Sequence, residues 1–109
     1  MDIVYLCVPY SHPDENVRNM RADIADRLAA RLMERGNIVF SPISHSHRIA
    51  PNIGNCNQTD FWIKQDLPFL EIADVVVVAM LDGWEESKGI KIELEHAKKR
   101  GIPVRWITT

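Results

Sequence analysis

The sequence ADVVVVAM at residues 73–80 is followed directly by LDGWEESKGIKIELEHA at residues 81–97. The first segment is short, rich in valine and uncharged after Asp74, which is typical of a strand buried on both faces of a sheet. The second begins with a polar turn containing Gly83 and then predicts a helix from Ser87, whose hydroxyl is suited to cap the first turn. A buried strand, a turn and a helix in this order indicate an α/β domain.

The rest of the chain repeats this alternation. The pattern predicts strands at residues 3–8, 38–40 and 102–107, and helices at residues 15–35, 59–72 and 87–100, with Pro68 kinking or splitting the second helix. Residues 41–58 are expected to form a structureless loop of the kind that serves as a lid or binding loop. The element order predicts a single α/β domain over residues 1–109. Its expected fold is three-layered and Rossmann- or flavodoxin-like, with a short parallel sheet of about four strands in the order 2-1-3-4.

Composition and charge narrow the function classes. The net charge is -2 and the densest basic run is residues 98–100, so a polymeric nucleic acid is not an expected partner. No segment approaches membrane-spanning length, and a membrane is not expected either. Cys7 and Cys56 do not indicate a disulfide framework and fit a reducing, cytoplasmic location. His45 and His47 with Cys56 or His12 lack a recognised tetrahedral spacing, so no metal is expected.

The predicted sheet also predicts where a ligand binds. In doubly wound sheets, ligands lie outside the carboxyl ends of the strands where the strand order reverses, here between the first and third strands. This rule places the turn after the first strand beside residues 82–89, with residues 41–58 leaning over both. The candidate binding residues of that first turn are Pro9, Tyr10, Ser11 and His12.

Two carboxylates are expected at this pocket. Glu93 lies three residues after Ile90 and four before Ala97, on the edge of an apolar helical stripe. Asp66 lies on a nominally apolar helix face just before the predicted kink. Two inward carboxylates at one pocket favour nucleophilic and acid–base chemistry. The alternative is that Glu93 pairs with Arg105 or a backbone amide and that Asp66 is solvated.

Three other side chains have open interpretations. Trp84 either stacks on a base or covers the end of the sheet or a subunit contact. His45 is a candidate for contact with a ligand. Cys7 is interpreted as a packed strand residue, because no cationic neighbour is evident that would activate its thiol.

Short motifs follow one another along the chain in a defined order. They are YLCVPY at residues 5–10, Asp66 eight residues before Asp74, the strand 75–78, Ser87-x-Gly89-x-x-x-Glu93, and GIPV at residues 101–104. In this order the motifs resemble the nucleoside 2-deoxyribosyltransferase superfamily over most of the chain. The versions at residues 9–12 and 83–87 more closely resemble a short bacterial and phage branch of that superfamily.

The resemblance implies a role for each matching residue. Glu93 matches the nucleophile, which attacks C1′ of the sugar and forms a covalent glycosyl ester while the base departs. Tyr5 matches the tyrosine that holds this carboxylate, and Asp66 matches the aspartate that contacts or protonates the leaving base. Ser87 stands where transferases carry an aspartate for the 5′-hydroxyl and where related nucleotide N-glycosidases carry a serine for a 5′-phosphate. Ser87 and Gly89 at a helix N-terminus suit an anion.

We therefore expect an enzyme that cleaves or transfers the N-glycosidic bond of a (deoxy)nucleoside or nucleoside 5′-monophosphate through a covalent glycosyl-Glu intermediate. Residues 9–12 differ from the Gly-Ser-rich loop of the nucleotide hydrolases, so the 5′ group of the substrate stays open. No cofactor is expected, and the resemblance implies a homodimer or homotetramer. The alternative is a non-catalytic nucleotide-binding or assembly module of the same fold. The joint presence of Tyr5, Asp66 and Glu93 favours the enzyme.

Overall fold

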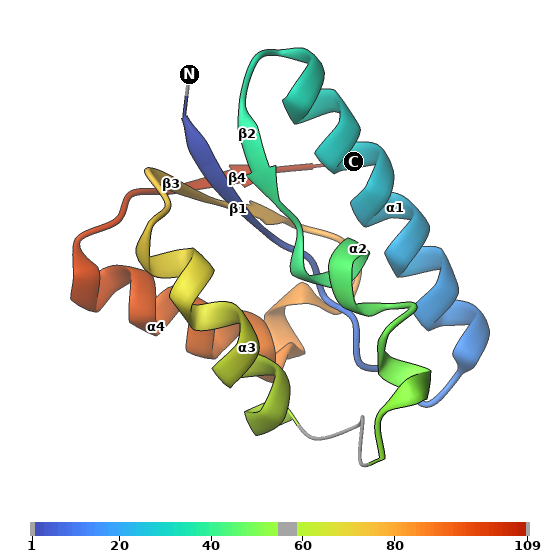
Figure 1. The fold of residues 1–109 in the computed structure, drawn as a ribbon. Coiled ribbons are helices and arrows are strands. Elements are labelled where there is room, and N and C mark those ends of the chain that lie inside the picture. The colour runs from blue at the N-terminus through green and yellow to red at the C-terminus, as the bar shows by residue number, and fades with distance from the viewer. Residues whose placement is uncertain (1, 55–58, 109) are drawn as a thin grey trace.

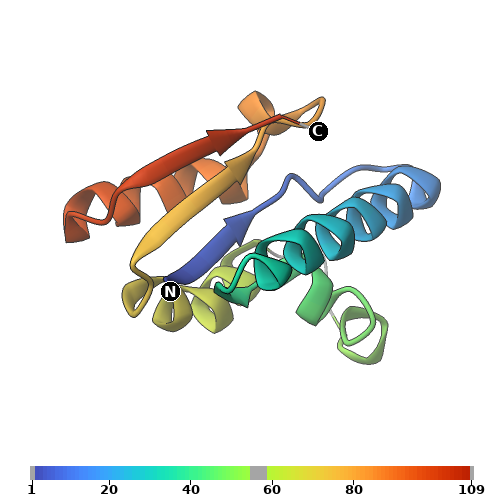
Figure 2. The ribbon, with the colours of Figure 1, turned by 90° about the horizontal axis from the view of Figure 1, so that it is seen from above.

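Four parallel strands form one sheet in the order β2-β1-β3-β4 in the computed structural model, which describes residues 2–54 and 59–108. The strands are β1 (Ile3–Cys7), β2 (Ile38–Phe40), β3 (Val75–Ala79) and β4 (Val104–Ile107). β1 and β3 pair in the middle of the sheet, with Tyr5 opposite Val76. Figure 2 shows β1, β3 and β4 pointing in the same direction. The predicted fold class and strand order are confirmed.

The helices cover both faces of this sheet (Figure 1). They are α1 (Glu15–Glu34), α2 (Pro42–Ser46), α3 (Thr59–Glu71) and α4 (Lys88–Arg100), with short 3-10 turns η1 (Ala50–Asn52) and η2 (Trp84–Glu86). Because successive strand residues face opposite sides, β1 contributes to two separate cores. Val4 and Leu6 pack with α1 on one face, and Tyr5 and Cys7 pack with α3 and α4 on the other. The molecule therefore has three layers.

One expectation about the chain between β2 and β3 is wrong. Residues 41–54 are not structureless, since they contain the helix α2 and the 3-10 turn η1, while residues 55–58 lie outside the described part. Pro42 at the start of α2 explains the helix, because a proline is favoured in the first helical turn, where no backbone donor is needed. Of the two effects expected from Pro68, a kink or a split, the split does not occur, since α3 continues through Pro68 to Glu71.

The helix α4 begins and ends as its sequence predicts. The Ser87 hydroxyl accepts a hydrogen bond from the backbone N–H of Ile90 at 3.2 Å, which caps the first turn. Gly101 ends the helix in a left-handed conformation, with φ of 69°. Among the helices of the described residues, none combines the length and hydropathy needed to cross a bilayer.

Candidate active site

A cavity of about 590 Å³ lies at the carboxyl ends of β1 and β3. Its walls come from the turn after β1, the turn after β3, the helices α2 and α3, and the first turns of α4. The strand order predicted that the two turns meet here, with residues of the segment after β2 over them. Of the candidate residues from the sequence, those lining the cavity are Pro9, Tyr10, Ser11, His12, Asp66, Ser87, Gly89 and Glu93.

Glu93 lies in the second turn of α4 and is only 7% exposed. The Tyr5 hydroxyl donates a hydrogen bond to one of its carboxylate oxygens. Burial raises the pKa of Glu93 to about 7, while hydrogen bonds from Tyr5 and the Cys7 thiol favour the ionised form and the nearby Asp66 opposes it. The Glu93 carboxylate is therefore held by Tyr5 of strand β1. Arg105, which the sequence offered as an alternative partner of Glu93, is exposed.

Tyr5 is fully buried. It holds the Glu93 carboxylate but does not itself line the cavity. Burial and the neighbouring Glu93 carboxylate raise the pKa of the Tyr5 hydroxyl well above its ordinary range, so the hydroxyl keeps its proton and acts as a donor. Cys7 lies two residues further along β1, on the same face of the sheet, and burial raises the pKa of its thiol as well. Cys7 is therefore packed, as expected, but it is packed beside the carboxylate.

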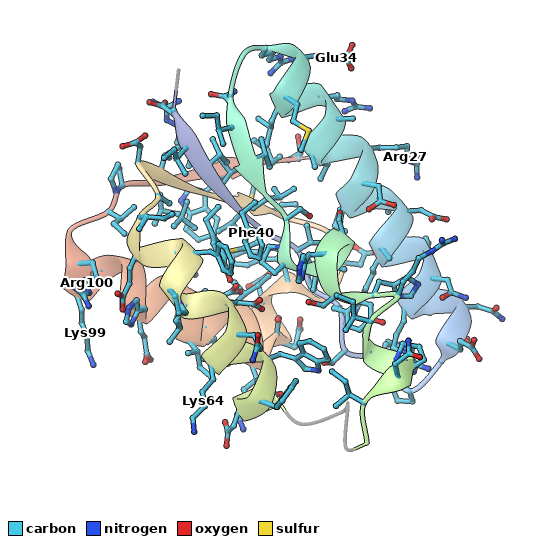
Figure 3. The ribbon with its side chains drawn as sticks, viewed as in Figure 1. Arg27, Glu34, Phe40, Lys64, Lys99 and Arg100 are labelled. Atoms are coloured by element: carbon cyan, nitrogen blue, oxygen red, sulfur yellow. The ribbon has the colours of Figure 1, made fainter. Side chains whose placement is uncertain are left out.

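Asp66 enters the cavity from α3 and is 8% exposed. Two residues earlier on the same helix, Lys64 points away from the body of the molecule (Figure 3). Burial raises the pKa of Asp66 to about 7. The protein therefore holds two carboxyl groups in one cavity, both of which retain a proton at higher pH than ordinary carboxyls do.

The turn after β1 is held by side chains that also line the cavity. The Tyr10 hydroxyl and Nδ1 of His47 lie 2.7 Å apart, which joins this turn to the end of α2. The His12 Nδ1 accepts a hydrogen bond from the Asp14 N–H at 3.0 Å, which leaves Nε2 as the protonated nitrogen of the neutral ring. His47 was not among the candidate residues. Had residues 42–46 been predicted to form a helix, the side chains of His45 and His47 would have been expected to point in different directions.

His45 and Trp84 are not among the residues that line this cavity. His45 packs against the ring of Phe40, which Figure 3 labels near the middle of the molecule, at a centroid distance of 5.7 Å. It lines a second, smaller hollow of about 170 Å³. Trp84 packs against Trp106 of the edge strand β4, at 5.2 Å between ring centroids, so it covers the end of the sheet. The sequence pattern does not encode these ring contacts, which depend on how distant elements pack.

Arg21 is a further cavity residue that was not expected from the sequence. It comes from α1 and is 8% exposed. Its spacing of four residues before Ala25 and seven before Leu28 places it on the buried stripe of that helix. The same criterion that selected Glu93 on α4 would have selected it.

Within residues 2–54 and 59–108, no group of three or more His, Cys, Asp or Glu side chains is arranged to hold a metal ion. Cys56, one of the residues considered as a metal ligand in the sequence, lies outside the described residues.

Comparison with known proteins agrees with this architecture. A family model described as "Domain of unknown function (DUF1937)" matches residues 2–108. No curated protein matches the chain at a significant level. Among solved structures, a similar one is the 2-deoxyribosyltransferase of the psychrotolerant bacterium Bacillus psychrosaccharolyticus, described as a suitable biocatalyst for the industrial synthesis of antiviral and antitumoral nucleosides. The match has a TM-score of 0.69 and 20% sequence identity, and it covers 97% of this chain and 72% of that one.

The resemblance stated from sequence motifs is therefore confirmed at the level of the fold, which is nucleoside 2-deoxyribosyltransferase-like. The family model spans nearly the whole sequence. The chain belongs to the DUF1937 family.

Proposed function

We propose that the protein cleaves or transfers the N-glycosidic bond of a nucleoside or nucleoside 5′-monophosphate, with Glu93 as the nucleophile. The observation that carries this proposal is the buried Glu93 carboxylate, held by the Tyr5 hydroxyl in the same cavity as the buried Asp66. The cavity of about 590 Å³ falls in the usual size range of small-molecule sites. The nucleosides associated with the similar transferase agree with this substrate class.

The protonation of the two carboxyls suits the first chemical step. With both pKa values raised to about 7, the pair carries about one proton between them at neutral pH. Because Glu93 accepts the hydrogen bond from Tyr5, we assign the ionised form to Glu93 and the shared proton to Asp66. One carboxyl is then a nucleophile and the other is a general acid.

In the first step, a Glu93 oxygen attacks C1′ of the sugar and forms an ester bond. The C1′–N bond breaks, its electron pair goes to the base, and the Asp66 carboxyl delivers its proton to that base. In the second step, water or another base attacks C1′, the Glu93–sugar bond breaks, and Asp66 takes the proton of the incoming nucleophile. Glu93 and Asp66 thus return to their starting protonation states.

The 5′ group of the substrate belongs at the start of α4. Ser87 and the first N–H groups of this helix lie at its positive end, which favours a phosphate. Asp82 and Glu86 line the same cavity, and their carboxylates are suited to accept a hydrogen bond from a 5′-hydroxyl. The proposed substrates therefore include both forms, and a direct comparison of the two distinguishes them.

The test is to incubate the protein with deoxyribonucleosides, ribonucleosides and their 5′-monophosphates, and to follow free base by chromatography. A second base is added in parallel reactions to detect transfer. We expect Glu93→Gln to abolish base release, because the amide keeps the shape of the side chain but not its nucleophilicity. Glu95→Gln, an exposed substitution on the same helix, is the matched control and is expected to keep activity.

Intact mass measured after an acid quench is expected to show a glycosyl adduct in the wild type and none in Glu93→Gln. Equal base release by the wild type and Glu93→Gln would refute the assignment of Glu93. Binding of a nucleotide with no base release from any substrate would support the non-catalytic alternative.

A further inference from the structure

The side chain of Arg21 reaches two backbone carbonyls that are far apart in sequence. Its Nη1 donates to the Ser11 carbonyl at 3.1 Å, and its Nη2 donates to the Asp82 carbonyl at 3.0 Å. Ser11 lies in the turn after β1, and Asp82 lies in the turn after β3. Because β1 and β3 are neighbours in the sheet, one guanidinium joins the two turns that form walls of the cavity.

The guanidinium is placed where its charge is costly. Arg21 is 8% exposed, and none of the ion pairs among the described residues involves it. A buried charge needs well-formed hydrogen bonds to offset its loss of hydration. Its fork of parallel donors meets this need by bonding to two carbonyls at once. Arg21 and the two turns thus hold one another in place.

Gly83 completes this arrangement. It has φ of 91°, a left-handed conformation that favours glycine. A Cβ atom at this position would lie 2.6 Å from Nη2 of Arg21, which is closer than two such atoms can approach. The absence of a side chain at Gly83 therefore gives the guanidinium its place beside the Asp82 carbonyl. We call Arg21, Gly83 and the carbonyls of Ser11 and Asp82 the arginine clamp.

We propose that Arg21 is a positioning residue, which sets the distance between the turn after β1 and the turn that leads into α4. This inference rests on the proposed function, because the turn that Arg21 holds leads to Ser87 and Gly89 and then to Glu93. A clamp that fixes both walls orders the sugar relative to the carboxylate before the reaction. Loosening the clamp weakens substrate binding and misplaces C1′ relative to the Glu93 carboxylate. Such misplacement of reacting atoms lowers the rate of the chemical step.

The experiment loosens the clamp in two independent ways. Arg21→Leu removes both hydrogen bonds. Gly83→Ala displaces the flexible end of Arg21 from the Asp82 carbonyl and leaves the arginine in the protein. Gly36→Ala is the matched control, since Gly36 has φ of 93° and an added Cβ there would meet no atom within 4 Å, so it carries the backbone strain without the collision. Base release is measured at a temperature where circular dichroism shows every variant to be folded.

We expect Arg21→Leu and Gly83→Ala each to lower kcat/KM at least tenfold, with a rise in KM, and Gly36→Ala to stay within twofold of the wild type. The double variant is expected to be no worse than Arg21→Leu alone, because alanine at position 83 no longer meets a guanidinium. Arg21→Lys, which keeps the charge and one donor, is expected to recover part of the loss.

Three results overturn the inference. An active wild type with Arg21→Leu and Gly83→Ala both within twofold of it refutes the clamp while the proposed function stands. Losses that multiply in the double variant show that Gly83→Ala acts independently of Arg21, which also refutes it. A wild type that releases no base from any substrate refutes the positioning role together with the proposed function.

Discussion

The substitution Glu93→Gln is expected to make the protein more stable at alkaline pH. Glutamine fills the same space and its side-chain oxygen still accepts from Tyr5, but it removes a carboxylate that burial disfavours. The pKa of Glu93 rises from its ordinary value of 4.5 to about 7 on folding. At about 1.4 kcal/mol for each tenfold change in proton affinity, this rise amounts to about 3 kcal/mol.

The direction of this pH dependence follows from which state, folded or unfolded, binds the proton of Glu93 more tightly. The folded protein has the higher pKa, so its protonated form is stabilised below pH 4.5, and this contribution is lost as the pH rises through about 7. The variant has no such loss. The difference between variant and wild type is therefore small at pH 4.5, grows between pH 4.5 and about 7, and levels off at about 3 kcal/mol at higher pH.

The assay is urea denaturation at about pH 4.5, 7.0 and 8.5, with the free energy of unfolding obtained by linear extrapolation. For a chain of this size, the difference at about pH 8.5 corresponds to an increase in Tm of about 10 °C. Glu95→Gln is the control, because Glu95 is exposed on the same helix and its removal is expected to leave the pH dependence unchanged. A Glu93→Gln variant that is no more stable than the wild type at the alkaline pH, or whose advantage does not vary with pH, would contradict this prediction.

Three further predictions concern neighbouring residues. Tyr5→Phe removes the hydroxyl that favours the ionised form of Glu93, so it is expected to lower base release at neutral pH at least tenfold and to move the acidic limb of the pH–rate profile upward; an unchanged profile would contradict this. Asp66→Asn removes the general acid and is expected to remove the alkaline limb, near pH 7, from a profile of residual activity; a retained limb would assign it to another group. Ser87→Ala removes the cap on the Ile90 N–H and is expected to cost about 1 kcal/mol in urea unfolding, whereas no loss would show that the cap is replaced.

The sheet was predictable because its strands and helices alternate with clear local signals. The valine run of β3 and the cap and stop of α4 each carry their structural meaning within a few residues. Right-handed crossovers then left few possible strand orders, and the strand order placed the cavity. Glu93 was identifiable because a charge on an apolar stripe is a local anomaly.

The unpredicted part of the site depends on contacts between distant segments. The role of Arg21 requires carbonyls that lie 10 and 61 residues away, and no local pattern encodes their position. His45 does not line the cavity, where it had been expected, because residues 42–46 form a helix. This helix directs His45 toward Phe40 and leaves His47 at the cavity. Short helices are difficult to recognise from sequence because most of their stability comes from packing.

The hydrogen bond between Tyr5 and Glu93 joins residues that are 88 positions apart. Bringing two such distant residues together costs more loop-closure entropy than forming a local contact does. During synthesis Tyr5 leaves the ribosome well before Glu93 does, and a nascent chain that stops before α4 holds only one of the two groups. Recovery of base release after dilution from urea is therefore expected to report the docking of α4 against β1, and not the formation of local structure alone.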